Sequence, residues 1–381
     1  MILALPMGLA IISQRRLWPI ILRDPAFYVL IGFVLLHLML AVFTIDSITS
    51  IVAGLAIDLR YILFFSLVYM LALALPGYRS LFVRVGVGGA LIVVLFGAAQ
   101  LLLPADVLVH IGYGPNTIAP YLTVDKNPDY VRINSTLRGP NPLGAYVTIV
   151  LAVLAAAWVR AKTKSHIVIA WLIGICGFVT LWITYSRSAV LALAIALGIV
   201  GLVAYGRRIG RKGWLAIGVI TIAVGGAFVA LRESALVSNV ILHENPDGGS
   251  IVSSNDQHVE SLADGVTRMV TQPFGAGIGS TGSASLYSDS PVIIENQYLF
   301  IAHEAGWLGL GLFVALFIMV LLRLWKGRSD WLSLGVFASG VGLGLIGLIQ
   351  PVWVDDTVSI VWWGLAALAL AKGAKHGRST K

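Results

Sequence analysis

The chain has 381 residues, of which 58% are hydrophobic and 12% charged, and its mean hydropathy is +0.90. Water-soluble globular proteins carry about 25% charged residues, so this composition excludes that class. The net charge of +8 would suit nucleic acid, but the basic residues stand in short clusters between apolar runs, which indicates membrane topology instead. The single cysteine, Cys176, excludes an intrachain disulfide and a CxxC metal site.

Apolar runs recur along the whole chain, and a helix of about 20 residues crosses the roughly 30 Å of hydrocarbon in a bilayer. Ten such runs lie near residues 27–43, 51–75, 85–103, 142–159, 167–184, 188–205, 214–231, 297–322, 331–350 and 358–371. The opening run, 2–12, is shorter, and it is either a short first helix or an interfacial one. The sequence therefore predicts an all-α polytopic membrane protein of about 10–11 transmembrane helices, forming a single transmembrane domain over residues 1–381.

Basic residues concentrate in alternate connections between these runs. The positive-inside rule makes those connections cytoplasmic. They carry Arg15, Arg16, Arg23, Arg79, Arg84, Arg160, Lys162, Lys164, Arg207, Arg208, Arg211, Lys212, Arg323, Lys326, Arg328, Lys372, Lys375, Arg378 and Lys381. The opposite, outer side then has two long loops, at about 104–141 and 232–296. We expect the chemistry of the protein in these loops, because the other outer connections are too short to hold a site.

The first outer loop ends in RINSTLRGPNPLGAY, residues 132–146. Arg132 and Arg138 are basic residues in an otherwise acidic outer layer, which favours an anionic ligand nearby. The structural alternative is a loop that starts the next helix, with Asn141 as its cap.

A very short outer turn between two spans contains Ser186 and Arg187. Arginines near span ends commonly reach toward lipid headgroups. The positive-inside rule, however, predicts no basic residue on this side, so Arg187 is a candidate functional residue.

The second outer loop contains a segment with helical periodicity. Its apolar positions are Val259, Leu262, Ala263, Val266, Met269 and Val270. They predict an amphipathic helix against the membrane or the helix bundle, with Ser254 and Gln257 as a capping box. Arg268 lies on the polar face with Ser261 and Asp264, and its structural alternative is an ion pair with Asp264.

A glycine-rich turn of the form PxGxGxG follows this helix at residues 273–279. Such a turn can bring backbone amides close to an oxyanion. It lacks the strand and helix context of a dinucleotide or P-loop site.

Glu295 and Asn296 stand directly before an apolar run, with His303 and Glu304 two turns further along. A carboxylate at a bilayer edge is costly unless it is solvated, paired or functional. The structural alternative is that Glu295 and Asn296 cap the helix, where a negative charge interacts well with the helix dipole.

Taken together, these motifs resemble the O-antigen ligase and O-antigen (Wzy-type) polymerase family of membrane glycosyltransferases. The resemblance covers roughly residues 50–370, from the arginine and Pro-Asn loop through the Ser-Arg turn to the long outer loop. Ligases of the family end this series with His-Asn or a close variant, nine residues and GxxG. Here the nine-residue spacing to Gly306 and Gly309 is kept, and Glu295 replaces the histidine.

The resemblance implies a GT-C-like fold that transfers a glycan from undecaprenyl diphosphate to an acceptor hydroxyl at the outer face of the bacterial inner membrane, without a metal or other cofactor. It assigns Arg187 and Arg268 to the diphosphate and Glu295 to removal of the hydroxyl proton, with His258 and His303 as alternative bases. The substrate-binding candidates are Arg132, Arg138, Asn141, Asn296 and His258. Implied partners are membrane lipids and a chain-length regulator and flippase of the same pathway.

The replacement of histidine by Glu295 favours a polymerase, which joins one lipid-linked glycan to another. A ligase, which hands the glycan to a lipid or protein acceptor, is the alternative within the family. A transporter or flippase is the alternative of another class. We rank it lower because the sequence places mid-span charges at little more than Asp58 and Arg60, whereas transporters keep ionisable residues or broken helices near the midplane.

Overall fold

The computed structural model describes residues 22–114, 117–124, 127–160, 166–232 and 254–376, together with residues 19, 234 and 237. The opening run 2–12 lies outside the described residues, as do the side chains of the expected capping box at Ser254 and Gln257.

Each of the ten expected spans coincides with a helix. They are α3 (Pro25–Phe43), α4 (Ile48–Ala74), α5 (Arg79–Ala99), α6 (Pro140–Arg160), α7 (Ile167–Ile183), α8 (Arg187–Tyr205), α9 (Arg211–Ala230), α12 (Gln297–Lys326), α13 (Trp331–Ile346) and α14 (Asp356–His376). Over the described residues, six of them are long and apolar enough to cross a membrane: α3, α4, α5, α6, α8 and α12. α7 and α13 are apolar but shorter. The protein is therefore an all-α, multi-pass membrane protein, and this prediction is confirmed.

The two long loops contain short elements of their own. The first holds a 3-10 helix (Val107–Ile111) and an antiparallel hairpin of β1 (Leu122–Val124) and β2 (Asn127–Arg132), which the sequence did not predict. The second holds α10 (Ser254–Thr271), where the amphipathic helix is predicted, and α11 (Gly282–Ser285).

The chain divides into two compact units. The first comprises residues 1–88 and 259–381, and the second comprises residues 89–258. α5 and α10 each contribute residues to both units.

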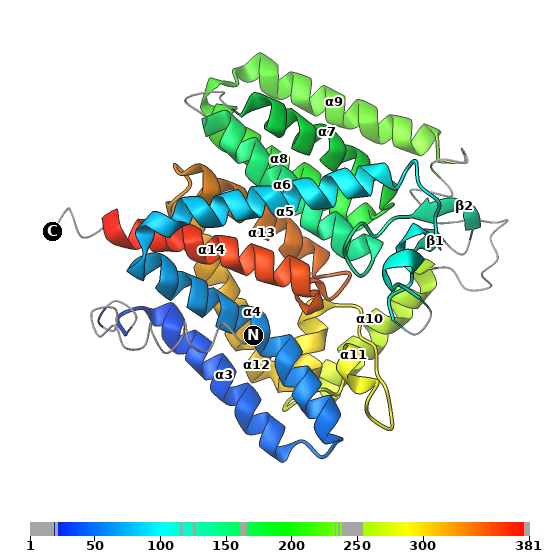
Figure 1. Ribbon diagram of the computed structural model, residues 1–381, viewed down its shortest axis with the longest axis vertical. Helices are drawn as coiled ribbons and strands as arrows, with labels where there is room; N and C mark the ends of the chain where they lie inside the picture. The colour runs from blue at the N-terminus through cyan, green and yellow to red at the C-terminus, as the bar shows by residue number, and fades with distance from the viewer. Residues whose placement is uncertain are drawn as a thin grey trace. The chain divides into compact units, whose positions relative to one another are not determined.

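The first unit is built on two helix pairs, α4 with α14 and α3 with α12, and α13 packs against α12 and α14 (Figure 1). Its core is aromatic. Trp353, Trp362 and Trp363 are fully buried, and they meet Phe317 and each other at ring-centroid distances between 5.1 and 6.3 Å. Phe313 extends the cluster by stacking on Phe317 at 6.1 Å. Large aromatic side chains remove much apolar area from solvent, so this cluster holds α12, α13 and α14 together.

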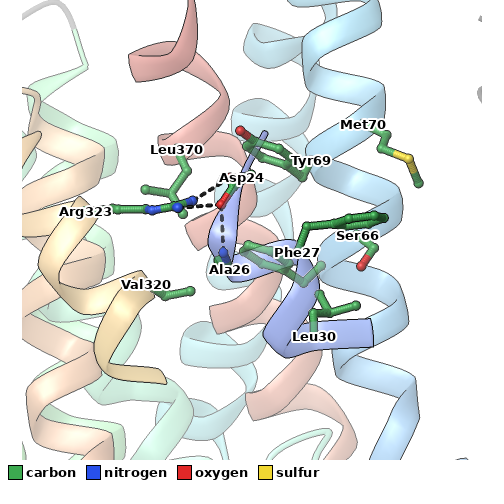
Figure 2. Close-up of a pocket in the computed structure, with 11 residues that line it drawn as sticks. Asp24, Ala26, Phe27, Leu30, Ser66, Tyr69, Met70, Val320, Arg323 and Leu370 are labelled. Carbon is green, nitrogen blue, oxygen red and sulfur yellow. Dashed lines mark hydrogen bonds and ion pairs between the residues drawn. The ribbon is translucent and has the colours of Figure 1, made fainter. Parts of the chain in front are cut away.

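Ion pairs gather at one end of the first unit, among the connections expected to be cytoplasmic. Asp24 accepts from the backbone N–H of Ala26 at the start of α3, and both its carboxylate oxygens bind the guanidinium of Arg323 in α12 (Figure 2). Asp330 binds Arg79 at 3.1 Å and Lys372 at 2.6 Å. These contacts agree with the prediction that the connections share one side of the membrane.

The other end of the first unit joins the α3–α4 connection to the second long loop, both of which are expected on the outer side. The hydroxyl of Thr44 accepts from Ile278 N–H at 3.0 Å, and the Ser47 hydroxyl donates to the Tyr287 carbonyl at 2.7 Å. The buried Ser50 hydroxyl contacts the carbonyls of Gly279 and Ala284. The loop is thus fixed to the end of the helix pair.

The second unit is centred on α6, which packs against α7 and α8 (Figure 1). Gly144 permits the close approach of α6 to α8, because a Cβ there would lie 2.7 Å from the Cβ of Ala189. The buried Thr148 hydroxyl reaches the Ala189 carbonyl at 3.2 Å. α6 therefore positions the start of α8, where Arg187 lies.

Candidate functional site

Arg132 ties three segments of the second unit together. It lies at the end of β2, and its Nε donates to the carbonyl of Thr184 at 2.8 Å. Its Nη2 donates to Oδ1 of Asn141 at 2.6 Å. The structural alternative placed Asn141 as the cap of the next helix. Instead, Asn141 is the second residue of α6, because α6 already begins at Pro140. Proline fits the first turn of a helix, where its missing N–H costs nothing.

Arg187 is the first residue of α8, directly after the α7–α8 turn that Arg132 binds. The turn is tight, and Tyr185 adopts a positive φ of 49°. Tyr185 meets Tyr130 of β2 edge to face at 6.2 Å, and burial, with a smaller effect of Tyr130, raises the pKa of the Tyr185 phenol. The structure thus brings Arg132 and Arg187 to the same turn, while Arg138 is exposed on the loop before α6.

A mainly apolar groove of about 650 Å³ lies beside this turn in the second unit. Its lining includes Phe178, Trp182, Ile183 and Tyr185. The groove thus begins at the aromatic side chain next to the Ser-Arg turn and continues along α7.

In the first unit, α10 contacts the start of α12 through its polar and small residues. The Ser261 hydroxyl accepts from the backbone N–H of Glu295 at 3.0 Å, and a Cβ on Gly265 would lie 3.0 Å from Leu299. The apolar stripe faces away from the protein, with exposed fractions of 42% to 66% at Val259, Leu262, Val266 and Val270. An exposed apolar stripe on a helix attached to a membrane bundle is suited to contact with lipid.

Arg268 lies near the end of this helix, and it forms the ion pair with Asp264 that the sequence offered as its structural role. Its Nε donates to Oδ2 of Asp264, one turn earlier, at 2.6 Å. Both side chains are partly exposed, so the pair orients the guanidinium more than it stabilises the fold. His258 lies on the same helix, ten residues or roughly 15 Å before Arg268.

The glycine-rich turn at residues 273–279 supplies hydrogen-bond donors to α12 at a break in that helix. Gly306 has a φ of +66°, which interrupts the helix and separates the carbonyls of His303 and Glu304 from their usual donors. The turn supplies replacements, since Ala276 N–H donates to His303 O at 2.6 Å and Gly277 N–H donates to Glu304 O at 3.2 Å. These amides serve the helix rather than an oxyanion. The positive φ of the break therefore explains why residue 306, the first position of the GxxG spacing, is a glycine.

A pocket of about 590 Å³ opens beside this break, within the first unit. Arg268, Gln272 and His303 line one part of it, and Asp46 and Asp289 line another. His303 is only 1% exposed, and no hydrogen-bond partner among the described residues reaches its Nδ1. The pocket therefore combines a cation, an amide and an imidazole within reach of a polar ligand.

Glu295 and Asn296 lie at the start of α12. Asn296 is its N-cap, and its Oδ1 accepts from the N–H groups of Tyr298 and Leu299 at 2.9 and 3.0 Å. Glu295 is half-buried and is not among the residues that line the pocket of Arg268 and His303. Arg187 belongs to the second unit and Arg268 to the first, so their joint binding of one diphosphate stays a prediction.

A cluster of buried ionisable side chains lies between α3, α4 and α12, and the sequence reasoning missed it. His37, Asp58 and Glu304 are 1%, 6% and 1% exposed. His37 Nε2 lies 3.8 Å from Asp58 Oδ2, and the carboxyl group of Glu304 interacts electrostatically with that of Asp58. The expectation that mid-span charges are limited to Asp58 and Arg60 is therefore wrong. The isolated His37 within the apolar run 27–43 was the available signal, because ionisable residues inside spans are costly.

No group of three His, Cys, Asp or Glu side chains among the described residues has the geometry to hold a metal ion. A scan of the chain against protein-family models finds no match, and no curated protein is significantly similar to it.

Proposed function

We propose that the protein is a polymerase that transfers an undecaprenyl-diphosphate-linked glycan repeat to the hydroxyl of another lipid-linked glycan, at the outer face of the bacterial cytoplasmic membrane. The observation that carries the proposal is the pocket in which Arg268 and His303 lie together, in a multi-pass membrane protein. Such a pocket suits a reaction between two lipid-anchored substrates whose polar parts meet at the membrane surface.

The leaving group of this reaction is a lipid diphosphate. As the bond between the anomeric carbon and the phosphate oxygen breaks, the electron pair remains on that oxygen and negative charge develops. Arg268 suits this charge, because only its Nε is used by Asp264 and a guanidinium carries further N–H donors in a planar fork. Arg187 is the second candidate by resemblance, and electrostatic stabilisation of this kind is a large contribution to catalysis.

The acceptor hydroxyl forms the new bond to the anomeric carbon and loses its proton to a base. The resemblance assigns this role to Glu295. The pocket offers His303 as the alternative, because its imidazole lines the same space as Arg268. Either residue can take up the single proton that the step releases.

The apolar groove along α7 supports the lipid part of the donor. Phe178 and Trp182 are 52% and 54% exposed at the side of a span, and Tyr185 stands at the turn that precedes Arg187. A polyprenyl chain against these side chains would place its diphosphate toward the arginines of the turn. This arrangement fits a long isoprenoid better than a nucleotide sugar.

Reconstitution of the purified protein with a purified undecaprenyl-linked repeat unit tests the proposal. A ladder of glycan lengths is expected for a polymerase, and a single transfer product would indicate a ligase. Arg187→Ala and Arg268→Ala should each abolish lengthening while membrane insertion stays intact. Arg84→Ala, at a connection expected on the opposite side, is the matched control. Normal chain lengths in both site variants would remove the diphosphate role.

Proton-coupled transport of a glycan precursor is a second candidate, and the His37, Asp58 and Glu304 cluster together with the break at Gly306 favours it. Transporters place ionisable groups and discontinuous helices inside their spans. Proteoliposomes distinguish the two functions. A transporter moves the lipid-linked glycan between leaflets in response to a pH gradient without lengthening it, whereas a polymerase lengthens it without such a gradient.

A further inference from the structure

The buried cluster lies well inside the membrane-spanning helices. His37 is six residues before the end of α3, and Glu304 is seven residues after the start of α12. Asp58 is ten residues after the start of α4. At 1.5 Å per residue these positions are about 10 to 15 Å from the helix ends, a third to a half of the hydrocarbon thickness. Ionisable groups at this depth are retained for function far more often than for stability.

The two carboxyl groups face each other. Glu304 interacts electrostatically with Asp58, and no hydrogen-bond partner among the described residues reaches Asp58 Oδ2 or Glu304 Oε2. An ionised carboxylate is only an acceptor, so two carboxylates cannot form a hydrogen bond with each other. A proton on one of the two groups would supply the donor that these buried oxygens lack and would remove the repulsion between two adjacent charges. The N–H of Thr281, 3.3 Å from Glu304 Oε1, is the additional donor that orients Glu304.

A hydrogen bond defines which nitrogen of His37 carries a hydrogen. Its Nδ1 lies 2.8 Å from the carbonyl oxygen of Phe33, which can only accept, so Nδ1 carries a hydrogen. Nε2 therefore faces Asp58 Oδ2, at 3.8 Å, which is within ion-pair range but too long for a hydrogen bond. His37 can hold a second proton on Nε2 beside the carboxyl pair.

Charge balance favours a protonated pair. With both carboxyls ionised and His37 protonated, the cluster would carry one net negative charge inside the bilayer, and a shared proton removes it. The nearby arginine does not neutralise this negative charge. Arg60 of α4 is held by the Val354 carbonyl and by Asp356 of α14, the latter at 2.5 Å. Among the described residues, Tyr61 of α4 and His303 of α12 are further titratable neighbours.

We propose that Asp58 and Glu304 form a proton-binding site in which one exchangeable proton is shared between the two carboxyl groups, with His37 as the adjacent third group. The site lies behind the wall of the pocket, since Ser280 and His303 line the pocket and the next residues, Thr281 and Glu304, form the site. The site stands independently of glycan transfer and of transport.

Infrared difference spectroscopy on the full-length protein in lipid tests this site without any substrate. The wild type should show a protonated-carboxyl C=O band at neutral pH that shifts in D2O, and the double variant Asp58→Asn, Glu304→Gln should lose it. Each single variant should shift the band, because the remaining carboxyl loses its partner. Asp330→Asn is the matched control and should leave the band unchanged, because Asp330 is held by Arg79 and Lys372 as a carboxylate.

Titration of the wild type alone covers the case in which the double variant does not fold. The band should disappear reversibly as the pH is raised, and it should not respond to sodium at constant pH. Identical spectra of the wild type and the folded variants in the protonated-carboxyl region would overturn the proposal. Loss of the band on addition of sodium at neutral pH would also overturn it, because the oxygens would then be a metal-ion site.

Discussion

The guanidinium of Arg132 binds Thr184 through Nε and Asn141 through Nη2, so one side chain fixes the first outer loop to the α7–α8 turn and to the start of α6. A planar fork makes both contacts at once, and a lysine ammonium at the same position has no equivalent geometry.

We therefore expect Arg132→Lys to lose one contact and Arg132→Ala to lose both. The alanine variant should lower the free energy of unfolding by about 1 to 3 kcal/mol, because the Thr184 carbonyl and the Asn141 amide lose a charged donor. Thermal unfolding of purified protein in detergent measures this. Arg138→Ala, six residues further along and exposed, should change the melting temperature much less. Equal losses in the two variants would show that the contacts of Arg132 do not stabilise the loop.

Glu295→Gln tests the base that the resemblance assigns. The variant should cut the rate of glycan transfer by about 10²- to 10⁴-fold, the usual contribution of a general base, with donor binding largely preserved. Transfer rates and donor affinity in the reconstituted system measure both effects. An unchanged rate would return Glu295 to a structural role at the start of α12. A loss in His303→Gln alone would then assign the base to the imidazole in the pocket.

Gly306→Ala should destabilise the break in α12. Its φ of +66° disfavours any side chain, and a Cβ there would lie 2.5 Å from the Pro273 carbonyl oxygen. The left-handed conformation alone costs about 1 to 2 kcal/mol, and the overlap adds to it. Gly311→Ala is the matched control in the same helix, because a Cβ there would meet no side chain or other segment within 4 Å. It should be neutral or stabilise by up to about 1 kcal/mol through helix propensity. Equal melting temperatures for the two variants would contradict this account of the break.

The ion pairs of Asp330 should make stability depend on pH. Burial opposes ionisation, but the Lys372 hydrogen bond and the charges of Arg79 and Lys372 outweigh it and lower the pKa of the Asp330 carboxyl. A lowered pKa stabilises the fold above the ordinary value near 3.9, and this stabilisation is lost as the pH falls through the lower folded-state value.

Asp330→Asn should therefore lower the melting temperature at neutral pH and bring the variant closer to the wild type in acid. The asparagine keeps a side-chain oxygen that can cap α13, as Asp330 does by accepting from Ser333 N–H, so the comparison isolates the charge. A difference between variant and wild type that stays constant with pH would indicate that the ion pairs do not stabilise this end of the unit.

The sequence by itself determined the class of protein and the positions of its helices. Apolar runs of membrane length have one stable solution in hydrocarbon, a helix that satisfies its own backbone, so all ten runs coincide with helices. The periodicity of residues 259–270 likewise predicted α10, and the four-residue spacing of Asp264 and Arg268 predicted their ion pair. These are local properties, set by residues within a few turns of each other.

Only the tertiary structure decided which distant polar groups meet. His37, Asp58 and Glu304 come from three helices, and no spacing within any one apolar run connects them. The glycine turn at 273–279 suggested an anion site, but its amides serve the carbonyls that Gly306 leaves open some thirty residues later. Hydrogen bonds of this kind depend on packing between segments, and the spacing of residues along the chain does not encode them.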